Sequence, residues 1–387
     1  MKFTITAALL VVVFSCSKKH EAVEPIPATS IAKQKAFNCT FGIADFNKTK
    51  YPLTEDAAVT KRKLESLPEP IAALPATIYL DFDGQLVSGT YWNTGGDINA
   101  TPANLPFSVI EKIIQRVTED FIPFNVTVTT SQAVYNNSNA HKRIRVIITE
   151  AWEWYGVAGG AAFNNSFQWG NNTPAFVFST LLSYNEKWIA EAISHEVGHT
   201  LSLEHQANYG SGCVLLTEYF AGKGDGIIGW APIMGSNYFQ NVTTWHKGNT
   251  SGGCGVVQDD VAILTSILGA KQDEGDATHK SEPAGLHSNA IINSSTDVDM
   301  FYVDLKNDAT LTAMPSCLDN CVGANVDLQI KVFNKNGNLV QTTTDPATLL
   351  ASCRVPAGKY FVSVETVANA NQNRYGMLGR YQLQVMN

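Results

Sequence analysis

Hydrophobic and polar positions repeat with different periods along this chain, and the changes of period divide it into regions. Short apolar or alternating runs, typical of strands, occur at residues 77–84, 124–130, 143–150, 158–163 and 175–179. Two longer stretches, residues 107–122 and 188–201, repeat apolar side chains at helical spacing. Residues 258–268 indicate a third helix, and Asp259 and Asp260 suit its positive amino end. This succession predicts an α+β domain over residues 75–270, a twisted mixed sheet with helices packed on it.

A polar linker at residues 271–285 precedes a region with a different pattern. Within residues 286–387, the segments MFYVDL, VDLQIKVF, GKYFVSVETV and RYQLQVM alternate or run as strands, separated by the turn sequences KNG and PAG. Strands at this density without helical periodicity predict an all-β sandwich. The chain has 387 residues, of which 44% are hydrophobic, so it can bury at least one large core, and its length suggests two domains.

The first residues have the pattern of an export signal. Lys2 precedes an apolar run that ends at Phe14, too short for a membrane span, so residues 1–15 are expected to be a signal peptide. The run ends in VFSC, which resembles the lipobox of bacterial lipoproteins. The resemblance implies a lipid on Cys16 and a place in the bacterial cell envelope, lipid-anchored to the outer membrane on its periplasmic or surface face, or secreted. An ordinary signal peptide with an incidental cysteine is the alternative.

Residues 16–74 are expected to form a tether and a pro-segment. They begin polar and proline-containing, and they show no clear periodicity. Cleavage would fall near the basic cluster at residues 61–63, and Cys39 would bind a metal in a latent form or join a disulfide. A plain spacer is the alternative.

The clearest chemical motif is HEVGHTLSLEH at residues 195–205. His195 and His199 are four residues apart on the second predicted helix, so both imidazoles lie on one face and can reach one cation. A continued helix would carry His205 to the wrong face, so we expect a turn between the last two histidines. Glu196, about 100° round the helix from His195, can face a water at the metal without being a ligand. The spacing predicts a zinc hydrolase.

This motif resembles the HExxHxxGxxH motif of the metzincin metallopeptidases, and APIMGSNY at residues 231–238 resembles their methionine turn. The resemblance implies a metzincin-like catalytic domain whose active-site helix provides ligands for Zn²⁺ together with the bend beyond it: His195, His199 and His205. It implies Glu196 as the general base and Met234 beneath the site. It also implies a zinc endopeptidase that hydrolyses protein or peptide substrates.

One residue departs from the metzincin pattern, because Ser202 stands where the motif has glycine. Glycine suits a backbone with positive φ, which serine adopts only at a cost of about 1–2 kcal/mol. Either the turn is built differently or the site carries strain.

The segment AGGAAF at residues 158–163 is the expected substrate-binding edge. Its small side chains let another backbone approach closely, and metzincins pair an extended substrate with an edge strand above the zinc. By resemblance, Gly159, Gly160 and Ala161 would line this rim, and an ordinary edge strand weakened by glycine is the alternative. Tyr238 is a further candidate, whose hydroxyl would stabilise the oxyanion that develops on the substrate.

Six cysteines remain after Cys16, and an even number in an exported protein suggests disulfides, with fifteen possible connectivities. Cys213 and Cys254, which bracket the methionine turn, are expected to pair by proximity. The last domain is expected to supply one pair and one partner for Cys39 from its three cysteines: Cys317, Cys321 and Cys353. The net charge of −8 without a basic patch argues against nucleic acid as a partner, and we expect a monomer.

The last region resembles the pre-peptidase carboxy-terminal domains of secreted bacterial proteases, in the succession TDVDMFYVDL, NVDLQIKVFNKNGNLV and VPAGKYFVSVE. The resemblance implies substrate binding, surface binding or assistance with secretion. Because some of these domains hold Ca²⁺, Asp297, Asp299 and Asp327 are candidate calcium ligands. Carboxylates that only serve turns and strand edges are the alternative.

Two other functions stay open at this point. A non-enzymatic surface-binding lipoprotein would have a structural or occluded zinc site, whereas deacetylation or another amide hydrolysis would use the same metal chemistry. An open fourth coordination position favours an enzyme, and a fourth protein ligand favours the binding protein.

Overall fold

The computed structural model describes residues 36–38, 57–67, 75–272, 287–316 and 323–386. The predictions for the signal peptide, for the lipid on Cys16, and for Cys39, Cys317 and Cys321 lie outside the described residues. Within the described part of the chain, no helix combines the length and hydropathy that crossing a membrane requires.

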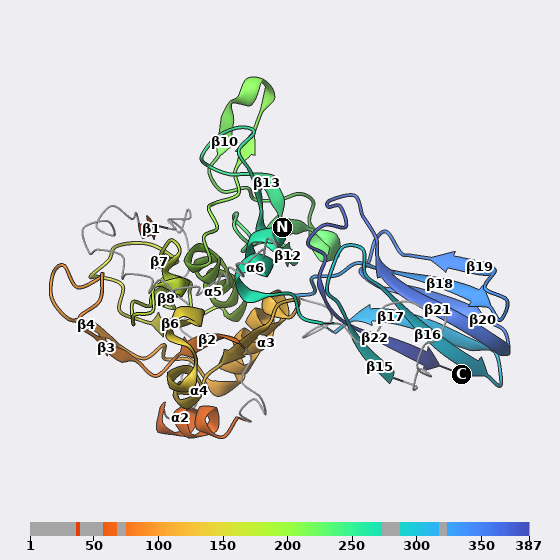
Figure 1. Cartoon of the computed structure of the whole chain (residues 1–387), viewed down its shortest axis with the longest axis horizontal. Helices are drawn as coiled ribbons and strands as arrows, with labels where there is room; N and C mark the ends of the chain where they lie inside the picture. Colours follow the sequence, from red (N-terminus) through yellow and green to blue (C-terminus); the bar gives the residue numbers. More distant parts are fainter. Residues whose placement is uncertain (1–35, 39–56, 68–74, 273–286, 317–322, 387) are drawn as a thin grey trace, which may run out of the picture. The chain divides into compact units, whose positions relative to one another are not determined.

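The first domain is built on a six-stranded mixed sheet, as predicted (Figure 1). Four neighbouring strands run parallel, β7 is antiparallel to β8, and β1 is antiparallel to β7. The parallel strands β2 and β8 are buried along their whole length, as expected of strands covered on both faces. Across the sheet the order is β1 (Ala36–Asn38), β7 (Gly160–Phe163), β8 (Ala175–Phe178), β6 (Arg143–Thr149), β2 (Ala76–Asp81) and β5 (Val126–Thr129).

Two long helices pack against each other and against this sheet. The helix α3 (Phe107–Phe121) buries most of its apolar side chains and contacts β5. The helix α5 (Glu186–Thr200) contacts β7 and β8, and its side chains are buried from Ile189 to its end. Its start is fixed by Asn185, whose side-chain oxygen accepts a hydrogen bond from the backbone N–H of Trp188 at 3.1 Å. The helix that carries the histidine motif is therefore part of the core.

Several short elements did not follow from the sequence pattern, because their segments show no clear apolar period. Most are strand pairs within loops. They are α2 (Ala57–Glu65), α4 (Gln132–Asn137), the 3-10 turns Ala140–Lys142, Ser166–Gln168, Ser211–Cys213 and Gly226–Ile228, and the pairs β3 (Gln85–Val87) with β4 (Ile98–Ala100), β9 (Asn208–Tyr209) with β10 (Leu215–Thr217), β11 (Trp230–Pro232) with β12 (Val242–Thr244), and β13 (Lys247–Asn249) with β14 (Val257–Asp259).

The helix α6 (Asp260–Leu268) closes this domain where a helix was predicted. Asp259 caps it, since its side chain accepts a hydrogen bond from the backbone N–H of Ala262 at 3.0 Å. Asp260 is instead fully buried and accepts hydrogen bonds from Gln206 at 3.0 Å and Gln258 at 2.9 Å. Of the two acidic residues, one therefore starts the helix and the other joins a buried polar network.

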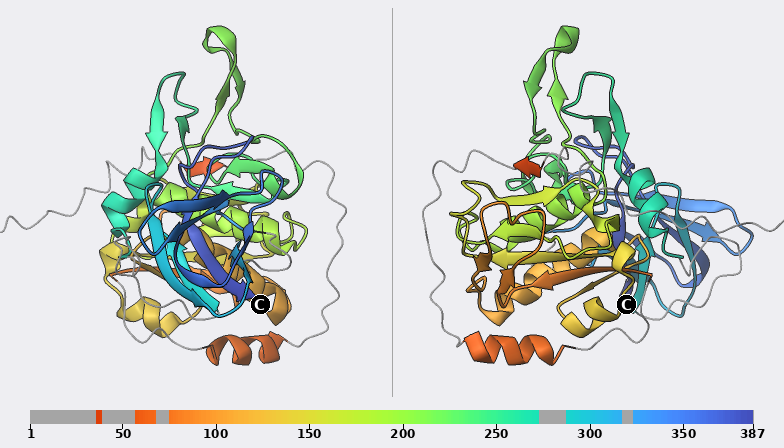
Figure 2. Two further views of the ribbon diagram at one scale, coloured as in Figure 1. Left: turned by 90° about the vertical axis from the view of Figure 1, so that its right-hand side faces the viewer. Right: turned by 60° about the vertical axis from the view of Figure 1, so that its left-hand side comes forward.

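The second domain consists of two four-stranded antiparallel sheets, which confirms the predicted β-sandwich (Figure 2). Strand β18 shows the expected alternation of buried and half-buried residues over most of its length. One sheet has the order β15 (His287–Ile292), β22 (Gly379–Met386), β17 (Ala309–Pro315) and β20 (Ala351–Val355), and the other β16 (Val298–Leu305), β21 (Gly358–Thr366), β18 (Leu328–Asn334) and β19 (Leu339–Thr343).

The cysteine predictions are confirmed in one case and wrong in another. Cys213 and Cys254 form the predicted disulfide. Cys353, expected to form a disulfide within the last domain or with Cys39, has a free and buried thiol. It lies opposite Leu311 in the pairing of β20 with β17, where it packs as a small apolar side chain of the sandwich core.

Candidate metal centre

The structure brings the three histidines of the motif together. Ring centroids lie 4.8 Å apart for His195 and His199, 4.7 Å for His199 and His205, and 5.3 Å for His195 and His205. Their ligand atoms all lie within 4.8 Å of one another, and among the described residues no other group of three His, Cys, Asp or Glu side chains does so. The predicted convergence of the three imidazoles is confirmed.

The return of the third imidazole depends on the turn that ends α5. The backbone N–H of Leu203 donates to the carbonyl of Gly198 at 3.0 Å, and that of Ser202 donates to His199 at 2.9 Å. This Schellman pattern requires positive φ after the helix, and Ser202 has a φ of 75°. The turn therefore has the conformation that suits glycine, and serine adopts it with the expected strain. The Ser202 hydroxyl donates to Oδ1 of Asn165 at 3.1 Å.

The outer nitrogens of the three rings fix how the inner nitrogens can act. Nδ1 of His195 and of His199 faces a backbone carbonyl oxygen at 2.8 and 2.7 Å, and Nδ1 of His205 faces Oε1 of Glu218 at 3.0 Å. These oxygens accept hydrogen bonds, so each Nδ1 carries the hydrogen and each Nε2 of a neutral ring carries a lone pair. The Nε2 atoms of His199 and His205 are 3.0 Å apart. Two nitrogens on one tetrahedral Zn²⁺ lie about 3.3 Å apart, so the residues fit this ion.

The surroundings of the imidazoles favour their neutral form. The three side chains are no more than 2% exposed. Burial lowers the pKa of His195 to about 4, and burial with the neighbouring His195 and His205 holds the pKa of His199 well below its usual value. Neutral imidazole is the form that binds a metal. Protons therefore compete weakly with a metal ion for these imidazoles near neutral pH.

Glu196 lies against strand β7 where that strand has no side chain. A Cβ on Gly160 would lie 2.6 Å from Cγ and 2.7 Å from Oε1 of Glu196, and 2.8 Å from the carbonyl oxygen of Phe176. The glutamate is 1% exposed. Gly160 therefore makes room for this carboxylate, which is a different role from the substrate approach expected from the sequence.

The other expected rim residues also lie in or next to β7. Ala161 pairs with Phe176 of β8 on one side and with Asn38 of β1 on the other, and the carbonyl of Gly159 accepts a hydrogen bond from Phe178. The outer side of β7 is thus paired with a segment from the chain's own amino-terminal part. Substrate binding at this edge stays a prediction.

Met234 lies directly beneath α5. It is fully buried, and its Sδ occupies the space that a Cβ on Gly198 would need. Its carbonyl accepts a hydrogen bond at 2.8 Å from the backbone N–H of Gln206, the residue after His205. Met234 therefore contacts the histidine helix and also steadies the segment that carries the third imidazole.

A different tyrosine from the expected one lies against the imidazoles. The ring of Tyr238 packs on Trp188 at 6.3 Å, and its role at the metal stays a prediction. The ring of Tyr219 lies 4.2 Å from that of His205, beside Glu218. No motif marks these two residues. Their position between the third histidine and the methionine turn is the one sequence signal that could have pointed to them.

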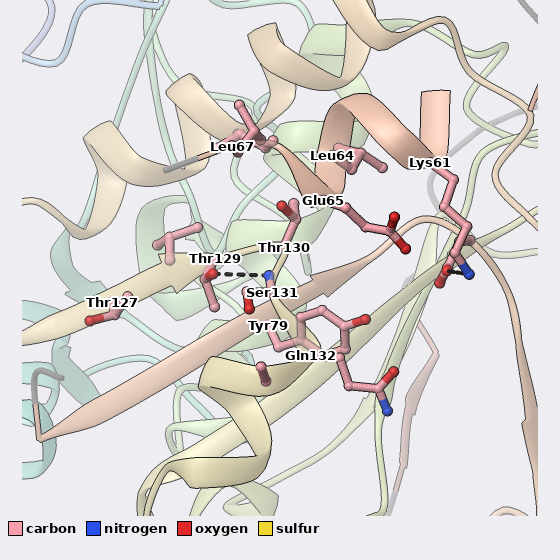
Figure 3. A pocket seen from close by; sticks show the side chains of 14 residues that line it. Lys61, Leu64, Glu65, Leu67, Tyr79, Thr127, Thr129, Thr130, Ser131 and Gln132 are labelled. Carbon is pink, nitrogen blue, oxygen red and sulfur yellow. Dashed lines mark hydrogen bonds and ion pairs between the residues drawn. The ribbon is translucent and has the colours of Figure 1, made fainter. Parts of the chain in front are cut away.

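A cavity of about 570 Å³ lies away from the histidines, between α2, β2, β5 and the start of α4 (Figure 3). Its wall includes Thr129, Ser131 and Lys61, and Lys61 forms an ion pair with Asp83 at 2.8 Å. Lys61 begins the basic cluster proposed for cleavage, and the whole cluster lies within the helix α2. Cleavage there stays a prediction, and it would require this helix to unwind.

The three candidate calcium ligands of the sandwich domain are buried and hydrogen-bonded within it. Asp299 accepts a hydrogen bond from the hydroxyl of Tyr381 at 2.6 Å, whereas Asp297 and Asp327 each accept one from an N–H group at 2.8 Å. They do not form a close ligand cluster among the described residues. A calcium site here stays a prediction.

Comparison with known proteins gives no family. No family model and no curated protein matches the chain. Among solved structures, a pre-peptidase C-terminal domain of collagenase from Bacillus anthracis is similar at 15% identity and a TM-score of 0.20, over 28% of this chain and 98% of that one. OgpA from Akkermansia muciniphila is similar at 10% identity and a TM-score of 0.22, over 83% of this chain and 99% of that one. Similarities at this level do not establish a shared fold.

Proposed function

We propose that this chain is a zinc-dependent hydrolase and, more narrowly, a metzincin-like endopeptidase that cleaves peptide bonds. The observation that carries the proposal is the convergence of three imidazoles, with the buried Glu196 next to His195 in the sequence. Three neutral ligands leave the double charge of Zn²⁺ uncompensated and a coordination position open.

The residues of the site divide the work of hydrolysis. Zinc, when bound by His195, His199 and His205, supplies Lewis-acid polarisation and a lowered pKa for a nearby water. Glu196 accepts the proton that the attacking water loses and then delivers it to the leaving amine. Because Gly160 leaves room for this carboxylate on β7, an extended peptide added to the same strand would lie next to the proton acceptor.

The pairing of β1 with β7 supports the proposal that residues 16–74 contain a pro-segment. Ala36–Asn38 occupies the outer side of β7 in antiparallel register, which is where an extended substrate would add. In this proposal the unprocessed chain blocks its own substrate edge until the segment is released. The protein would act as a monomer in the bacterial cell envelope, lipid-anchored or secreted.

The test of the enzymatic proposal is Glu196→Gln, with both the variant and the unaltered protein prepared as residues 64–387 so that β1 is absent. This variant should bind one zinc ion per chain by metal analysis, while cleavage of a proteome-derived peptide library should fall by about 10²–10⁴-fold. The unaltered chain treated with a chelator is the matched control. Equal activity of the variant and the unaltered chain would remove Glu196 as the proton acceptor, and absence of zinc from both would remove the metal centre.

One observation favours the alternative, a surface-binding lipoprotein with an occluded zinc site. The imidazoles and Glu196 are almost completely buried, and Tyr219 lies against His205. The two proposals differ in what release of β1 does. Phe37→Pro, which removes a backbone donor from β1, should raise peptide cleavage by an enzyme, whereas Phe37→Ala leaves the backbone unchanged and serves as control. No cleavage by any of the three chains, with zinc bound in each, would favour the binding protein.

A further inference from the structure

The chain between the third histidine and α6 forms two loops that a disulfide joins. One loop contains β9 and β10, the other contains β13 and β14, and Cys213 is bonded to Cys254 across them. Figures 1 and 2 show both loops standing away from the sheet on the same side of this domain. The first loop leads directly back to the metal centre at residues 218 and 219.

The histidines differ in what holds their outer nitrogens. Nδ1 of His195 meets the carbonyl of Ile233, and Nδ1 of His199 meets the carbonyl of Leu203. Nδ1 of His205 instead meets the carboxylate of Glu218 at 3.0 Å. The imidazole is 1% exposed and the glutamate 53% exposed, so the hydrogen bond joins a buried ligand to a residue that solvent reaches.

We propose that Glu218 is a positioning residue that orients His205 and strengthens its Nε2 as a zinc donor, and that the disulfide-joined loops hold Glu218 in place. A carboxylate draws the Nδ1 hydrogen toward itself more strongly than a carbonyl does, and this raises the basicity of the opposite nitrogen. The carboxylate of Glu218 also places a negative charge near the three imidazoles, which as neutral ligands carry no charge themselves. The inference rests on the proposed zinc site.

The packing around His205 supports an orienting role. The ring of Tyr219 lies 4.2 Å from the imidazole of His205. Gln206, which follows His205, donates hydrogen bonds to the carbonyl of Met234 and to the buried side chain of Asp260. The neighbouring backbone is therefore fixed, and the hydrogen bond to Glu218 selects the ring orientation. Losing a partner of this kind costs about 10- to 100-fold in metal affinity.

The test measures zinc affinity in the full chain by competition with a chromogenic chelator. Glu218→Ala should weaken zinc binding about 10- to 100-fold, and Glu218→Gln, which keeps an acceptor of the same shape, should weaken it less. Glu204→Gln is the matched control, because it removes the charge of another exposed glutamate, next to His205 in the sequence, and the hydrogen bonds with Gln258 involve only the backbone of Glu204. With cobalt in place of zinc, the visible absorption spectrum should change for Glu218→Ala and stay unchanged for Glu204→Gln.

The outcomes separate this inference from the proposed function. Zinc binding that is insensitive to residue 218, or an equal loss in Glu204→Gln, would overturn the inference and leave the metal centre standing. Absence of zinc from the unaltered chain would overturn both. Replacing both Cys213 and Cys254 by serine should weaken zinc binding in the unaltered chain and add nothing to Glu218→Ala. Additive losses would overturn the role of the loops.

Discussion

The contact between Gly160 and Glu196 gives the sharpest prediction, the effect of Gly160→Ala. The added Cβ would lie 2.6 Å from Cγ of Glu196, and ordinary contacts begin at 3.4 Å, so about 0.8 Å of overlap must be relieved. The carbonyl of Phe176, 2.8 Å away on the other side, belongs to the paired strand β8 and gives way less easily than a side chain. The carboxylate therefore moves. A shift of about 1 Å in a reacting group costs about 10²-fold in rate.

We expect Gly160→Ala to lower kcat/KM for peptide cleavage about 10²-fold and the free energy of unfolding by about 1–3 kcal/mol, with zinc content unchanged. The measurements are steady-state kinetics, urea unfolding and metal analysis. Gly95→Ala is the control, because a Cβ there meets nothing within 4 Å. In a Glu196→Gln background, Gly160→Ala should add no further loss of rate. Full activity of Gly160→Ala with its zinc retained would refute the placement of the proton acceptor.

Three further predictions concern stability. Ser202→Ala should lower the free energy of unfolding by about 1 kcal/mol, because the hydrogen bond to Asn165 is lost while the positive φ remains, whereas in Ser202→Gly relief of strain offsets that loss to within about 0.5 kcal/mol; equal urea midpoints for the two variants would contradict this. Burial, and then Glu191, raises the pKa of Asp120 to about 8, so the stability contributed by its proton is complete below about pH 4 and is lost as the pH rises toward 8. As the pH rises through that window, the stability of Asp120→Asn relative to the unaltered chain should therefore increase by up to about 1.4 kcal/mol per pH unit. A stability difference between the two chains that stays constant in urea unfolding from pH 5 to 8 would be the contrary result. Chelation should lower the Tm in calorimetry, since zinc at 100 times its Kd adds about 2.7 kcal/mol, and His205→Ala should abolish this sensitivity.

The long elements of the fold followed from the sequence because their apolar periods are long enough to read. The helices at residues 107–121 and 186–200, the buried strands and the sandwich all lie where the pattern put them. The pairing of β1 with β7 could not be predicted, since three residues carry no period and their partner lies more than 120 residues away. The buried thiol of Cys353 was missed for a related reason, because counting cysteines says nothing about which ones face a core.

At the candidate metal centre, the sequence identified the residues that belong to its two motifs and missed those that no motif marks. The spacing of His195 and His199 on a helix is enough to place both, and the need for a bend placed His205. Glu218 and Tyr219 reach the same imidazole from a loop, and no spacing rule connects a loop residue to a ring in space. The role of Gly160 was also hidden, because the sequence shows small size and cannot show which neighbour uses the space.

The structure of β7 couples the position of any peptide that replaces β1 to the position of Glu196. The residue that leaves room for Glu196 and the residue that pairs with Asn38 are consecutive, at positions 160 and 161. A displacement of the outer edge of the strand would therefore reach Glu196, the proposed acid–base group, across a single peptide unit. Peptides that pair poorly with β7 should be bound weakly and also cleaved slowly. Across a series of peptides, KM should therefore rise as kcat falls.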